Sequence, residues 1–133
     1  MTDHLPAPAN VTLAGHEIFP IAWGMWRFAG ADVATARARI DVAFEAGVTL
    51  FDTADIYGAD TAGGFGSAEA LLGDVLAEAP GLRGQMVLAT KGGIIPGVPY
   101  DSSPAYLTSA IDVSLRRLRT DHVELWQVHR PDL

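Results

Sequence analysis

Asp52, Lys91 and His129 each follow directly on a short apolar run, and Tyr57 stands five residues past Asp52. Side chains alternate along a strand, and neighbouring parallel strands bring their carboxyl ends to the same edge of a sheet. If the three apolar runs are such strands, Asp52, Lys91 and His129 project from one rim. The Tyr57 side chain can then reach the same rim. We call these four residues the tetrad.

A carboxylate, an ammonium, a phenol and an imidazole in one pocket suit the protonation of an oxyanion as it forms. A phenol ordinarily titrates at about pH 10, but a nearby ammonium makes it a stronger acid. We therefore assign Tyr57 as the general acid, Lys91 as the cation that activates it, and Asp52 as the partner that keeps Lys91 charged. His129 would orient a substrate carbonyl. The tetrad thus fits carbonyl reduction by hydride transfer.

Other interpretations of these residues exist. Taken singly, Asp52 could be a loop cap, Lys91 a solvated charge and Tyr57 a packing residue. A barrel-type metal hydrolase could use Asp52, Asp55 and His129, but a paired-histidine motif is absent and Lys91 would sit amid the metal's charge. We therefore predict no metal site. The glycines that follow Lys91 are a weak indication of phosphate binding without a full phosphate-loop pattern.

Short apolar runs alternate along the chain with amphipathic segments that begin at good helix caps. Such strands, nearly continuous in apolar residues and separated by helices, indicate an α/β fold whose parallel sheet is covered on both faces. The predicted elements are a hairpin over 11–13 and 17–19, buried strands over 21–23, 48–51, 86–90 and 123–128, and helices capped by Asp32, Ser67 and Ser103.

Composition limits the class of protein. The 133 residues suffice for one domain with a core. A net charge of −7 argues against nucleic acid or an anionic membrane surface as a partner. The lack of cysteine excludes disulfides, thiolate catalysis and cysteine-based zinc sites. No apolar run is long enough to span a bilayer and the N-terminus lacks a signal-like pattern, so we expect a cytoplasmic protein.

Several stretches together resemble the N-terminal half of the aldo-keto reductase family, and the resemblance covers nearly all of residues 1–133. They are Gly47–Ala54, Tyr57-Gly58, Ser67–Gly73, Ala89–Lys91 and Gln127–Asp132. The resemblance implies a partial (β/α)8 TIM barrel, in which an N-terminal β-hairpin closes the floor and four parallel strands with three helices form half of the wall.

The resemblance also implies a function. The expected reaction is NAD(P)H-dependent reduction of an aldehyde or ketone, with NADP as the expected cofactor and NAD as the less favoured one. The family's catalytic residues correspond to the tetrad, with Tyr57 as the acid. Gly24, Met25 and Trp26 resemble the first strand–helix loop and are, with Asp52, the candidate cofactor contacts. Trp26 and Phe28 join Tyr57 and His129 as candidates for the substrate pocket.

The chain nevertheless has too few elements for a whole barrel, which typically takes about 250 residues and eight strand–helix units. A half barrel leaves two unpaired sheet edges and an open apolar face. We expect a missing C-terminal half or self-association to cover them, and we favour a fragment of a longer protein over a complete product. The alternative function is a non-catalytic half barrel that serves as an assembly module and retains the tetrad.

Overall fold

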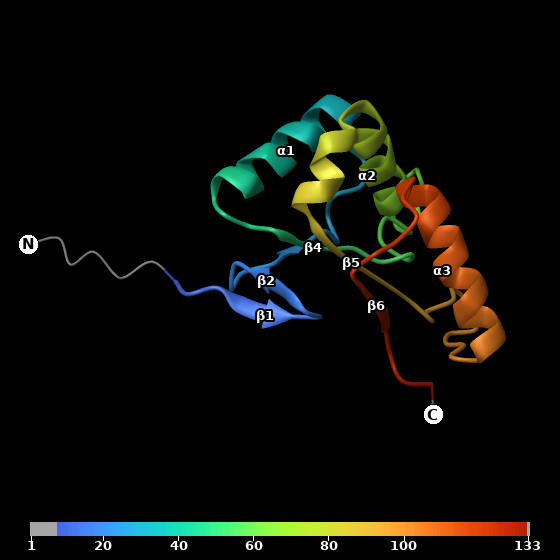
Figure 1. Ribbon diagram of the computed structural model, residues 1–133. Coiled ribbons are helices and arrows are strands. Elements are labelled where there is room, and N and C mark those ends of the chain that lie inside the picture. Colours follow the sequence, from blue (N-terminus) through green and yellow to red (C-terminus); the bar gives the residue numbers. More distant parts are fainter. Residues whose placement is uncertain (1–7, 133) are drawn as a thin grey trace, which may run out of the picture.

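The computed structural model describes residues 8–132 and shows a parallel sheet with three helices along one side (Figure 1). A separate two-stranded hairpin precedes the sheet. The elements are β1 (Val11–Leu13), β2 (His16–Ile18), β3 (Trp23–Gly24), α1 (Val33–Glu45), β4 (Leu50–Asp52), α2 (Ser67–Glu78), the 3-10 helix η1 (Pro80–Gln85), β5 (Val87–Gly92), α3 (Pro104–Leu118) and β6 (Leu125–Val128).

The sheet has the strand order β3-β4-β5-β6, and each neighbouring pair is parallel. Strands that are consecutive in the chain therefore lie side by side, as in a barrel wall, without the reversal of order that marks a doubly wound sheet. In register, Gly24 lies beside Asp52, Asp52 beside Ala89, and Lys91 beside Gln127. This register carries the ionisable residues to one edge of the sheet.

Two of the three predicted helix caps are confirmed. The Asp32 side chain accepts a hydrogen bond from the Thr35 N–H at 2.7 Å, and the Ser103 side chain accepts one from the Tyr106 N–H at 3.3 Å. The prediction for α2 was wrong by one residue: Gly66 is its cap, with a φ of 85° that favours glycine, and Ser67 is the first helical residue. No helix within residues 8–132 is long and apolar enough to cross a membrane.

Apolar side chains cover both faces of the sheet and form two cores. On the helix side, residues of all three helices pack against Phe51 and Leu88, both fully buried. On the other face, Ile18 of the hairpin packs against Leu50, Val87 and Ala89, with Leu125 beside them. The hairpin therefore covers the apolar part of the sheet face that points away from the helices. The polar residues lie nearer the carboxyl ends of the same strands.

Five strands differ from their predicted extents. β2 (His16–Ile18) and β4 (Leu50–Asp52) are shifted slightly along the chain from the predicted 17–19 and 48–51, and β3, β5 and β6 differ as follows. The predicted buried strand over 21–23 is a two-residue edge strand, and Ile21 before it is 61% exposed. The reason is that β3 pairs only with β4 among the described residues. β5 continues past its predicted end to Gly92, which places Lys91 inside the strand, and β6 begins only at Leu125.

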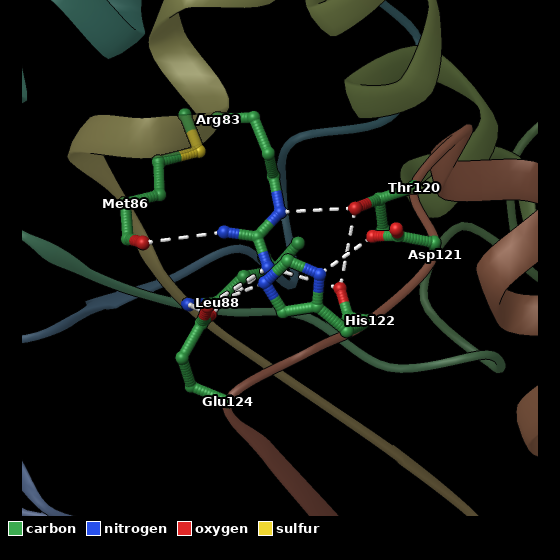
Figure 2. Close-up of polar contacts among 7 residues, drawn as sticks. All are labelled: Arg83, Met86, Leu88, Thr120, Asp121, His122 and Glu124. Carbon is green, nitrogen blue, oxygen red and sulfur yellow. Dashed lines mark hydrogen bonds and ion pairs between the residues drawn. The ribbon is translucent and has the colours of Figure 1, made fainter.

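A polar cluster around Arg83 ties η1 to the starts of β5 and β6 (Figure 2). The guanidinium binds both carboxylate oxygens of Glu124, at 2.9 and 3.1 Å, and donates to the His122 carbonyl at 2.9 Å and the Thr120 hydroxyl at 3.1 Å. Glu124 also accepts the Leu88 N–H at 2.7 Å. Although burial opposes ionisation, these donors hold the pKa of Glu124 below its usual range. The cluster lies at the opposite end of the strands from Asp52 and Lys91.

Candidate active site

A partly buried ion pair lies at the carboxyl ends of the strands. The Lys91 Nζ donates to Asp52 Oδ2 and to the Thr53 carbonyl, both at 2.8 Å, and Lys91 is only 8% exposed. Gln127 donates to the other oxygen of Asp52 at 3.3 Å. A buried charge is retained only when it is paired and hydrogen-bonded, and Lys91 meets both conditions.

Tyr57 lies against this pair because the chain turns directly after β4. The Tyr57 N–H donates to the Ala54 carbonyl at 3.1 Å, which closes the turn. The Lys91 ammonium then lies 4.9 Å from the centre of the Tyr57 ring, and the His129 ring meets the same ring edge-on at 5.8 Å. The structure therefore brings the whole tetrad together, from the ends of β4, β5 and β6.

His129 is fixed just past β6 by its own backbone, whose N–H donates to the Gly92 carbonyl at 2.8 Å. Burial, and then the charges of Lys91 and Arg130, lower the pKa of His129. Its imidazole is therefore neutral at neutral pH. Its Nδ1 atom is buried without a hydrogen-bond partner among the described residues, while the residue as a whole lies on the wall of a pocket.

A pocket of about 420 Å³ opens beside Tyr57 and His129. Trp26, which is 63% exposed, forms part of its wall. Sequence reasoning missed the other lining residues, although each belongs to a loop that follows a strand end, where binding residues concentrate. These residues are Ile56, Ala59, Asp60, Ile94 and Arg130.

Two residues expected at the site lie elsewhere. Phe28 is 1% exposed and its ring packs edge-on against Trp23 at 5.7 Å, in the core on the helix side. The Met25 side chain is fully buried in the same core, and its N–H donates to the Asp52 carbonyl at 2.9 Å. The expectation of Phe28 as a pocket residue, and of Met25 as a side-chain contact, is therefore not supported. Gly24 lies beside Asp52 with open space around it.

The three residues of the metal alternative do not gather. Asp52 is engaged by Lys91, whereas Asp55 lies against Gly92, on the helix side of the sheet. Within residues 8–132, no group of three histidine, aspartate or glutamate side chains could hold a metal ion.

A second, larger hollow lies away from the tetrad. It measures about 610 Å³ and follows β3 and α1, with Ile21, Trp23 and Val42 in its almost wholly apolar wall. A surface with so few polar groups offers nothing for acid–base chemistry. We interpret it as a packing surface and the smaller polar pocket as the candidate site.

The fold and the site define a class of protein. The family model described as the aldo/keto reductase family matches residues 20–133, and the chain belongs to this family. Its fold is a partial (β/α)8 barrel, as the resemblance predicted. A putative aldo-keto reductase from Pseudomonas aeruginosa superposes with a TM-score of 0.76 and 28% identity, over 93% of this chain and 47% of that one.

Among relatives in sequence, the chain is 54% identical to a 6-dehydroglucose reductase from Novosphingobium aromaticivorans, over 100% of this chain and 45% of the relative. It is 39% identical to a 6-dehydroglucose reductase from Agrobacterium fabrum, over 87% of this chain and 41% of the relative. The chain therefore spans less than half the length of these relatives. The family membership makes the chain part of an oxidoreductase family.

Proposed function

We propose that residues 1–133 form the N-terminal half of a barrel that reduces an aldehyde or ketone to an alcohol, and that activity requires the complete barrel. The observation that supports this most strongly is the partly buried Lys91–Asp52 pair, whose ammonium lies against the Tyr57 ring, with His129 against the same ring. Asp52, Lys91 and His129 come from the ends of three neighbouring strands and Tyr57 from the turn after β4; Tyr57 and His129 line one pocket.

Each member of the tetrad has a role in this proposal. Tyr57 gives its hydroxyl proton to the substrate oxygen as negative charge develops there. Lys91, held charged by Asp52, stabilises the phenolate that Tyr57 becomes. His129, which is neutral and lines the pocket, hydrogen-bonds the substrate and orients its carbonyl. Trp26 limits water access from the pocket wall.

A nicotinamide cofactor, which aldo-keto reductases generally bind, would supply the hydride. The described residues fit such a group at its reactive end: Gly24 has open space around it, Trp26 is exposed, and His129 lines the pocket. We therefore propose Gly24, Trp26 and Asp52 as contacts, with Met25 contributing through its backbone alone. NADP rather than NAD remains our expectation from the family resemblance.

The substrate we propose is a polyhydroxylated aldehyde, such as the sugar aldehyde in the names of the two relatives. The pocket supports this because Asp60 and Arg130 lie on its wall together with the exposed ring of Trp26. A carboxylate and a guanidinium bind hydroxyl groups, and an aromatic face packs against the C–H groups of a sugar ring.

The decisive test is Tyr57→Phe in the complete natural protein that contains these residues. We expect carbonyl reduction to fall by about 10²–10⁴-fold, because proton transfer by a positioned side chain contributes that much. Cofactor binding, followed by nicotinamide fluorescence, should persist. Tyr100→Phe, outside the pocket, is the matched control. Turnover close to wild type in Tyr57→Phe would refute the assignment of the general acid.

An assembly module is the second candidate, and the open apolar groove along β3 and α1 favours it. Size-exclusion chromatography of the 133-residue chain, combined with NADPH titration, separates the two functions. A defined oligomer that binds NADPH and reduces an aldehyde would argue against a purely structural role. A stable oligomer that neither binds NADPH nor turns over an aldehyde would favour it.

A further inference from the structure

Two carboxylates are buried behind the end of β5, on the helix side of the sheet. Glu69 of α2 is fully buried; it accepts the Thr90 hydroxyl at 2.7 Å and pairs with Arg117 of α3 at 3.3 Å. Because side chains alternate along a strand, Thr90 and Gly92 face this cluster while Lys91, between them, faces the pocket. The cluster therefore lies directly behind the tetrad without touching the pocket.

The second carboxylate, Asp55, is 2% exposed and links β5 to the turn that carries Tyr57. Its backbone N–H donates to the Lys91 carbonyl at 3.0 Å. Its side chain fits beneath Gly92, where an added Cβ would lie 3.0 Å from Asp55 Oδ2. The other oxygen, Oδ1, is buried without a partner among the described residues. Nothing in the tetrad's chemistry accounts for such a group.

The charged and titratable groups around Asp55 come from three elements. They are Glu69 of α2, Arg117 and Tyr106 of α3, and Lys91 of β5. Arg117 is already paired with Glu69, and Lys91 with Asp52. Burial and then the negative charge of Glu69 raise the pKa of Asp55 to about 7. A protonated Asp55 therefore keeps the cluster near electrical balance.

We propose that Asp55 is a pH-sensitive positioning residue, whose buried side chain anchors the Tyr57 turn to the end of β5 and releases it on losing a proton. The neutral acid can stay buried beside Glu69. The ionised form cannot do so without a partner for its charge, because a buried unpaired carboxylate is costly and repels its neighbour. Asp55 is two residues from Tyr57, so its displacement moves the ring relative to Lys91. This proposal rests on the proposed function only where activity is the readout.

The first test uses no activity. Aspartate carboxyl carbons and tyrosine ring carbons are labelled with ¹³C in the complete natural protein, and NMR spectra follow a pH titration. Asp55→Asn and Tyr57→Phe assign the two resonances. We expect the Asp55 carboxyl to titrate close to neutral pH and the Tyr57 ring signal to shift with the same midpoint. In Glu69→Gln, which removes the repulsion but keeps an acceptor for Thr90, both midpoints should move together to lower pH.

The second test is the pH profile of kcat for carbonyl reduction. We expect wild-type kcat to fall by up to about tenfold roughly one pH unit above the Asp55 midpoint, where about one molecule in ten keeps the proton. Asp55→Asn imitates the neutral acid and should lose this step, while KM stays unchanged. Asp112→Asn, an exposed aspartate on α3, is the matched control and should keep the wild-type profile.

The outcomes separate the two proposals. An Asp55 carboxyl that titrates in the ordinary acidic range, or a Tyr57 ring signal that ignores the Asp55 titration, overturns the positioning role. The same holds if Asp55→Asn lowers kcat equally at every pH, as a purely structural residue would. If the Asp55 carboxyl and the Tyr57 ring signal titrate together in a protein that has no reductase activity, the positioning role is supported and only the proposed reaction is refuted.

Discussion

The charge state of the His129 imidazole depends on its burial and on two neighbouring cations. Burial, Lys91 and Arg130 lower its pKa, so the imidazole stays neutral until the pH falls below the usual histidine range. If the neutral ring binds the substrate, kcat/KM should fall only as the pH drops through this lowered value. Arg130→Gln removes one of the causes, so the acidic limb should move to higher pH.

The quantity to measure is the pH at which kcat/KM falls on the acidic side, rather than the maximal value of kcat/KM. Arg130 also lines the pocket, so its replacement can change that maximal value as well. Arg39→Gln, an exposed charge on α1, serves as the control and should leave the limb where it is. An unchanged limb in Arg130→Gln would show that another group governs the acidic side of the profile.

At the level of elements, the contact between α2 and α3 depends on one glycine. A Cβ added at Gly73 would overlap the backbone carbonyl oxygen of Arg117. Backbone cannot move aside as a flexible side chain can, so the overlap forces the helices apart. Alanine favours a helix by only about 1 kcal/mol over glycine, and we expect the overlap to cost more than that.

Gly73→Ala should therefore lower the free energy of unfolding by about 1–3 kcal/mol, measured from urea denaturation. Gly81→Ala is the matched control, because nothing lies within 4 Å of a Cβ added there. Equal midpoints for the two variants would contradict the close approach of the helices. A larger loss is expected if the Arg117–Glu69 pair also breaks.

These elements also show what the sequence could predict. Strand ends, helix caps and hydrophobic periodicity are local, so the order of elements, two caps and the meeting of the tetrad were foreseen. The Arg83 cluster was not, because Arg83 and Glu124 are 41 residues apart and only the folded register joins them. Asp55 was foreseen only as a metal ligand, since its burial depends on α2 and α3. The same long-range packing places the side chains of Phe28 and Met25 in the core on the helix side rather than at the pocket.

At the scale of the whole molecule, the described half barrel has open sheet edges and an apolar groove beside one of them. Among residues 8–132, β3 and β6 each have a strand partner on one side only. Beside β3 lies the apolar groove, in which Ile21 is 61% and Val42 is 64% exposed. Apolar patches next to an open sheet edge promote association.

We therefore expect the 133-residue chain, expressed alone, to self-associate, with a weight-average mass in sedimentation equilibrium that rises with protein concentration. The double variant Ile21→Lys, Val42→Lys should lower the association constant by about tenfold or more, because burying one apolar side chain contributes about 1.5–3 kcal/mol. Val98→Lys is the control: Val98 is 60% exposed but lies outside the groove.

Co-expression with a polypeptide that supplies the remaining strands should replace self-association with a one-to-one complex. A chain that stays monomeric at every concentration would mean that the groove and the open edges do not drive assembly.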